Sequence, residues 1–127
     1  MKKSRIWLII LLSVFAAAMM AFAVLNGIYK YRSDFKVTFI AESVSPDGEY
    51  SVVLDQVGEP DFPFGPVKAR ISLKAGDKTI RTVDTEVWDD GANLGAQSWN
   101  VEWREDGASV TLLGSEQEPE TVFLAKK

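Results

Sequence analysis

The pattern of hydrophobic and polar positions divides the chain into two parts. The first part holds an uninterrupted apolar run that begins at Ile6 and ends at Leu25, with no charged residue and one hydroxyl, Ser13. A helix over residues 6–25 extends about 30 Å, which matches the hydrocarbon core of a bilayer. The run therefore predicts a single transmembrane helix, and the lipid bilayer is its expected partner.

Two fates are open for this helix. The basic residues Lys2, Lys3 and Arg5 precede it, as in a secretory signal, and Ala21-Phe22-Ala23 offers a small-residue cleavage site. The apolar run, however, exceeds the roughly 7–15 residues of a signal's apolar region. This favours an uncleaved anchor over residues 1–33, made of a basic head, the helix and a juxtamembrane exit. Secretion after cleavage near Ala23 is the alternative.

Orientation follows weakly from charge, because Lys30, Arg32 and Lys36 on the far side balance the three basic residues of the head. The short basic head and the acidic remainder favour a cytoplasmic N-terminus. We therefore expect a single-pass membrane protein with an extracytoplasmic domain.

From residue 35 onward the apolar positions recur with a period of two, which is typical of half-buried β-strands. Phe35, Val37 and Phe39 share one face of the first strand, and Trp99 and Trp103 share a face that we expect to lie in the core. Turn dipeptides separate the strands. The alternating segments fall near residues 35–39, 50–55, 67–74, 79–87, 99–104, 109–113 and 121–125. Residues 34–127 are thus predicted to form an all-β domain of about seven short antiparallel strands, as a meander or small sandwich.

Charge separates the same two parts. Residues 1–33 carry five Lys or Arg and no acid, whereas residues 34–127 carry nine Lys or Arg and eighteen Asp or Glu. A domain with this acidic excess repels nucleic acid and anionic headgroups, so nucleic acid is not an expected partner.

The chain has neither cysteine nor histidine. Disulfides, thiolate catalysis, imidazole metal sites and the Ser-His pair are therefore excluded. No catalytic constellation is recognisable in the sequence, and we predict a protein that is not an enzyme and uses no cofactor.

The most individual segment is Gly-Glu-Pro-Asp-Phe-Pro-Phe-Gly-Pro at residues 58–66, because three prolines in it exclude a central strand. Phe62, Pro63 and Phe64 are candidate partner-binding residues, since rigid aromatic side chains on a loop lose little entropy on binding. In the alternative, the phenylalanines fold back and cover one end of a small core.

A second loop, Trp-Asp-Asp-Gly-Ala-Asn at residues 88–93, adds Trp88 as a candidate partner-binding residue. Asp89, Asp90 and Asn93 offer oxygen ligands suited to calcium, but they lack the spacing of an EF-hand loop. The same residue types are ordinary in turns, so no metal site is predicted and these three residues form a weak candidate.

Four motifs together resemble a family of small bacterial membrane proteins of uncharacterised function. They are Ser-Pro-Asp-Gly-x-Tyr at residues 45–50, Val-Gly-Glu-Pro-Asp-aromatic-Pro-Phe-Gly-Pro at 57–66, Trp-Asp-Asp-Gly at 88–91, and Trp-Asn-Val-Glu-Trp at 99–103. The resemblance covers most of residues 44–124. It implies one N-terminal membrane helix and a compact extracytoplasmic β domain, and it brings no activity.

These observations favour a membrane-anchored, non-enzymatic β domain that binds a protein or cell-envelope partner. Two alternatives stay open. The chain could be an accessory subunit acting through its transmembrane helix, where Ala16, Ala17, Ala18 and Ala21 provide a small-residue face. Less favoured is a secreted hydrolase or carbohydrate-binding module.

Overall fold

The computed structural model describes residues 2–127, except for the side chain of Ser33. Met1, the first residue of the predicted basic head, lies outside the described residues. The chain divides into two compact units between Arg32 and Ser33, and each is described by itself.

The first unit is helical. Helix α1 spans Lys2–Phe35, and its Lys2–Arg32 segment is long and apolar enough to cross a membrane. The helix is longer than the predicted span, because the polar exit at residues 26–34 is helical as well. No proline interrupts this exit, and Gly27 alone does not stop the helix. Phe35, predicted to begin the first strand, is the last helical residue.

The second unit contains seven strands, as the sequence predicts. A short 3-10 helix, Ala96–Ser98, precedes the fifth strand. The strands are β1 (Val37–Val44), β2 (Tyr50–Val57), β3 (Val67–Ala75), β4 (Lys78–Val87), β5 (Trp99–Arg104), β6 (Gly107–Leu112) and β7 (Glu120–Ala125).

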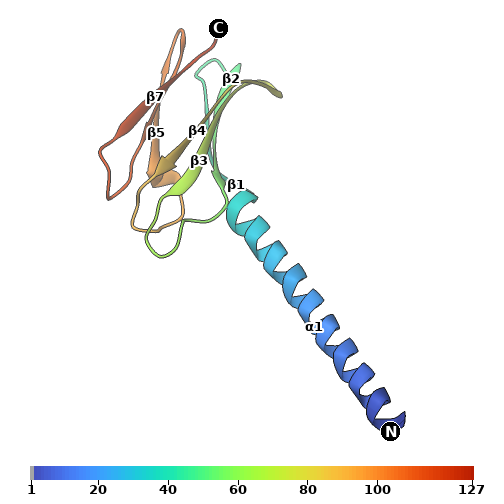
Figure 1. Cartoon of the computed structure of the whole chain (residues 1–127). Coiled ribbons are helices and arrows are strands. Elements are labelled where there is room, and N and C mark those ends of the chain that lie inside the picture. Colours follow the sequence, from blue (N-terminus) through green and yellow to red (C-terminus); the bar gives the residue numbers. More distant parts are fainter. Residues whose placement is uncertain (1) are drawn as a thin grey trace. The chain divides into compact units, whose positions relative to one another are not determined.

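All pairings are antiparallel between strands adjacent in sequence, which forms a four-stranded sheet in the order β1-β2-β3-β4 and a three-stranded sheet in the order β5-β6-β7 (Figure 1). The register shifts at a bulge between Phe39 and Ala41 in β1. The prediction of an all-β domain after one N-terminal helix is confirmed.

The core lies between the two sheets, where each sheet places one of its faces. Partly buried Trp99, Val101 and Trp103 of β5 pack against it, as predicted for the two tryptophans. The indole N–H of Trp103 donates to Ser43 Oγ at 2.9 Å and so joins β5 to β1. The buried core residues are Val52, Leu54, Val67, Ala69, Ile71, Leu73, Val87, Leu94, Ala108, Val110, Leu112 and Leu124.

The turn between β1 and β2 uses the predicted chemistry. Gly48 has φ +76°, and its N–H donates to the Ser45 carbonyl. The Ser45 hydroxyl donates to Asp47 and, with the backbone N–H of Glu49, lowers the pKa of that carboxyl. The Asp47 carboxylate thus accepts hydrogen bonds from residues on both sides of it in the turn.

Candidate functional site

Three long loops gather at one end of the β domain, the end at which β1 begins. They are residues 58–66 between β2 and β3, residues 88–98 between β4 and β5, and residues 113–119 between β6 and β7. We call this end the loop end (Figure 1). The N–H of Gly58 donates to the carbonyl of Lys36 at 2.7 Å, so the proline-rich loop starts beside the residue that precedes β1.

The proline-rich loop presents its aromatic side chains to solvent. Phe62 is 96% exposed and Phe64 is 64% exposed. The alternative in which these phenylalanines cover the core is therefore wrong. The core consists of eleven residues from the two sheets and Leu94 from the loop between β4 and β5, and it includes neither phenylalanine.

Hydrogen bonds within the loop hold its backbone. The N–H of Asp61 donates to the Pro66 carbonyl at 3.1 Å, and the N–H of Gly65 donates to the Asp61 carbonyl at 2.7 Å. A Cβ on Gly65 would lie 2.5 Å from the Cβ of Asp61, so the two arms of the loop approach as closely as glycine permits. The Phe62–Pro63 peptide bond at the tip is cis.

One buried side chain joins this loop to the next. Gln56 in β2 is 5% exposed, and its Nε2 donates to the Gly58 carbonyl at 3.0 Å and to Asn93 Oδ1 at 2.9 Å. Its Oε1 accepts from the N–H of Leu94 at 2.8 Å. A buried amide with all these partners fixes both loop backbones relative to each other.

The same two loops also touch directly. Gly91 has φ +74°, and a Cβ at this position would lie 2.9 Å from the Pro63 carbonyl oxygen and 3.1 Å from Phe64 Cα. Only glycine combines this backbone conformation with this close approach. The candidate residues Pro63 and Phe64 are therefore held against the loop that begins with Trp88.

Trp88, at 44% exposed, lies where the second and third loops meet. Its backbone N–H donates to Gln117 Oε1 at 2.6 Å, and its carbonyl accepts from the N–H of Glu116 at 3.1 Å. The structure thus places Phe62, Pro63, Phe64 and Trp88 on hydrogen-bonded neighbouring loops at one end of the domain.

Two of the three weak metal candidates have other partners. Asp89 Oδ1 accepts from the N–H of Ser115 at 2.9 Å, and Asn93 Oδ1 accepts from Gln56. Asp90 occupies a turn position with φ +53°. Among residues 2–127 no three His, Cys, Asp or Glu side chains are grouped so that they could hold a metal ion. Asp89 and Asn93 thus connect their loop to neighbouring segments in this structure.

The three loops carry charge of one sign. Their ionisable residues are all acidic, and none of the three ranges contains Lys or Arg. The acids are Glu59, Asp61, Asp89, Asp90, Glu116 and Glu118. The exposed aromatic side chains therefore lie in a negative field.

Sequence reasoning missed Gln56 and Gly91. Gln56 did carry a signal, since it follows Val52 and Leu54 at the same spacing and so falls on the inner face of β2. A polar residue at a core position needs hydrogen-bond partners, and here they are the two loops. No comparable pattern marks Gly91.

Comparison of the chain with protein-family models, with curated proteins and with solved structures gave no match. The resemblance to a family of bacterial membrane proteins stays a prediction carried by its motif residues.

Proposed function

We propose that this chain is a membrane-anchored, non-enzymatic β domain that binds a protein partner through Phe62, Phe64 and Trp88. The observation that carries this proposal is that their backbones are fixed by Gln56 and by neighbouring loops while the aromatic side chains face solvent. A prearranged aromatic surface gives up little entropy on binding.

The chemistry of the loop end favours one kind of partner. Large aromatic side chains act as anchors when they enter apolar sockets, and buried anchors carry most of an interface's energy. The six surrounding carboxylates favour a partner with lysine or arginine around such a socket, and they oppose an acidic one.

Connectivity supports a location for the partner near the membrane. β1 begins two residues after α1 ends, so the loop end is the end of the domain to which the helix is attached. With α1 spanning the membrane, the partner would be a protein at the same membrane surface, on the extracytoplasmic side. Sequencing the N-terminus of the mature protein tests the anchor. A chain beginning near Val24 and free in the medium would contradict it.

Site-specific photocrosslinking in native membranes tests the binding surface. A photoreactive phenylalanine analogue at position 62 should yield a discrete adduct with one protein. The matched control is the same analogue at position 123, where the phenylalanine is 45% exposed but lies on β7. Equal adducts at both positions, or none at position 62, would contradict the proposal.

The partner identified in this way allows a quantitative test with the full chain. The double variant Phe62→Ser, Phe64→Ser should weaken binding by about tenfold or more, the loss expected when interface anchors are removed. Phe123→Ser should leave binding unchanged. The exposure of both loop phenylalanines predicts an unchanged fold, which circular dichroism checks.

The alternative of an accessory subunit acting through its helix is supported by the alanine-rich face at residues 16–21. Exchange of residues 6–25 for an unrelated spanning helix separates the two. Binding survives the exchange if the loop end is the interface, and it is lost if the helix is.

A further inference from the structure

An open hollow lies beside Trp88, between the end of edge strand β4 and the segment that leads into β7. Thr85 Oγ1 of β4 and Glu120 Oε1 of β7 lie 3.4 Å apart here, so both sheets contribute to it. We call it the Trp88 hollow. Its lining residues are Thr85, Glu86, Trp88, Gln117, Glu118 and Glu120.

The loop at residues 113–119 fixes the position of Trp88. Besides the hydrogen bonds of the Trp88 backbone described above, the N–H of Ser115 donates to Asp89 Oδ1 at 2.9 Å. A Cβ on Gly114 would collide with the Trp88 carbonyl oxygen, so the loop approaches as closely as glycine permits. The walls of the hollow are therefore in place before a ligand arrives, and Trp88, at 44% exposed, still presents part of its side chain to solvent.

The charge of the Trp88 hollow is negative. Its lining contains three glutamates and neither Lys nor Arg. The ion pairs formed among residues 2–127, Arg70 with Asp84 and Arg104 with Glu102, involve none of these three glutamates. Charge complementarity therefore favours a cationic group from outside the chain.

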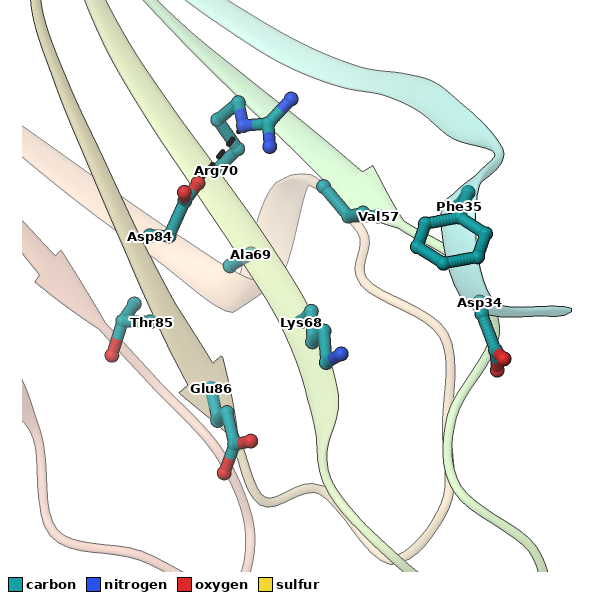
Figure 2. Close-up of a pocket in the computed structure, with 9 residues that line it drawn as sticks. All are labelled: Asp34, Phe35, Val57, Lys68, Ala69, Arg70, Asp84, Thr85 and Glu86. Atoms are coloured by element: carbon teal, nitrogen blue, oxygen red, sulfur yellow. Dashed lines mark hydrogen bonds and ion pairs between the residues drawn. The ribbon is translucent and has the colours of Figure 1, made fainter. Parts of the chain in front are cut away.

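A neighbouring hollow has the opposite arrangement of charge (Figure 2). It shares two residues of β4 with the Trp88 hollow. Lys68 and Arg70 also line it, and Arg70 Nε lies 2.9 Å from Asp84 Oδ1. Of the two, only the Trp88 hollow has no cation of the chain in its lining.

We propose that the Trp88 hollow receives an arginine side chain of the partner, with the guanidinium stacked on the indole and paired with the carboxylates of Glu118 and Glu120. This inference rests on the proposed function, because it names the partner residue that binds at Trp88. A guanidinium fits better than an ammonium, since it is planar, stacks on aromatic faces and is more weakly hydrated. Its N–H groups also form paired hydrogen bonds with a carboxylate.

Nuclear magnetic resonance of the full chain in a nonionic detergent tests this inference without the partner. The indole N–H signal of Trp88, assigned by its loss in Trp88→Phe, is followed while Nα-acetyl-arginine amide is added. Nα-acetyl-lysine amide and the neutral Nα-acetyl-citrulline amide are added in parallel titrations. The indole signal of Trp103, which binds Ser43, is the internal control.

We expect the arginine amide to shift the Trp88 signal saturably, by about threefold or more than either other amide at equal concentration. The Trp103 signal should not move. An equal shift with the lysine amide would mean that charge alone acts, and an equal shift with the citrulline amide would mean that charge is not needed. Either result, or no shift at all, would overturn the proposal. A shift with N-acetylglucosamine but not with the arginine amide would overturn it in favour of a sugar site.

A charge-matched pair of variants tests the role of the glutamates. Glu118→Gln with Glu120→Gln should weaken binding of the arginine amide by about two- to tenfold. The control is Glu49→Gln with Glu105→Gln, which removes the same charge from a hollow where β2 and β6 begin, at the opposite end of the domain. Equal weakening in both would mean that the overall charge of the domain attracts arginine, and would overturn the proposal.

The titration is independent of the test of partner binding. Phe62→Ser with Phe64→Ser should leave it unchanged, because neither phenylalanine lines the Trp88 hollow. A partner adduct at position 62 without an arginine-induced shift would overturn the arginine site alone. A shift without an adduct would support the arginine site and contradict the proposed function.

Discussion

Strands β1 and β3 carry apolar residues with the same period of two, yet the fold uses them in opposite ways. In β3, Ile71 and Leu73 are completely buried between the sheets. In β1, Val37 and Phe39 face outward and are at least half exposed. Alternation therefore identifies which residues share a face of a strand, and the side of the sheet to which that face turns decides whether it is covered.

The largest effect should separate these two strands. Ile71→Ala removes a fully buried side chain and should lower the free energy of unfolding by about 2–5 kcal/mol. Phe39→Ala removes a larger side chain from the outer face and should cost at most about 1 kcal/mol. Denaturant unfolding of both variants in the same detergent measures the difference. Equal losses would mean that the outer face is covered as tightly as the core.

A second variant, Gln56→Ala, tests whether the inner face of β2 also supports the loops through hydrogen bonds. Gln56→Ala leaves the Leu94 N–H and the Asn93 amide without their buried partner and should cost about 2–3 kcal/mol. It should also weaken binding at the loop end although every aromatic anchor is retained. Gln97→Ala, which changes an exposed glutamine of the same loop region, should alter neither quantity. Unchanged stability in Gln56→Ala would show that the loops do not depend on this side chain.

Two glycines with similar backbone conformations extend the comparison from strands to turns. Gly91→Ala meets the Pro63 carbonyl and should cost about 2 kcal/mol or more. Gly76→Ala has φ +61° but open space around its Cβ, and should cost about 1 kcal/mol from the backbone alone. Thermal unfolding measures the loss of stability in the two variants. A larger loss in Gly76→Ala than in Gly91→Ala would contradict the close contact between the loops.

The smallest expected effect concerns the carboxyl opposite Phe39. Burial raises the pKa of Asp55 above its ordinary value of 3.8, and Lys74 and Arg70 oppose this shift. The folded chain therefore binds the proton more tightly than the unfolded chain. As pH falls through the raised pKa toward 3.8, wild type should gain stability relative to Asp55→Asn, by less than about 1 kcal/mol for this partly buried group. If the free energies of unfolding of the two proteins change in parallel with pH, the Asp55 carboxyl does not contribute to the pH dependence of stability.

Much of the fold follows from local pattern. The alternating segments predict the seven strands, because the segments with a period of two are separated by turn residues such as Ser45-Pro46-Asp47-Gly48. The hairpin predicted at Asp106-Gly107 is shifted by one residue, since Glu105 and Asp106 form the turn and Gly107 begins β6. The end of the helix does not follow, since residues 26–34 contain neither a proline nor a strong stop signal. The outward orientation of Val37 and Phe39 does not follow either, since it depends on the register of β1 with β2.

The candidate site divides in the same way. Proline and aromatic content marks residues 58–66 in the sequence, but exposure of Phe62 depends on whether the two sheets close a core without it. The contact between Gly91 and Pro63 joins residues 28 positions apart, and no local pattern carries that information.

Gln56 couples the structures of the two loops at residues 58–66 and 88–98. The Gln56 side-chain amide forms hydrogen bonds with the Gly58 carbonyl, the Asn93 side chain and the Leu94 N–H. A change of length in either loop therefore disturbs the other loop. Grafting the proline-rich segment alone onto another β scaffold should therefore fail to reproduce its shape. Diversification of this end, in a laboratory library or among natural relatives, would have to alter both loops together or leave the glutamine and its three partners intact.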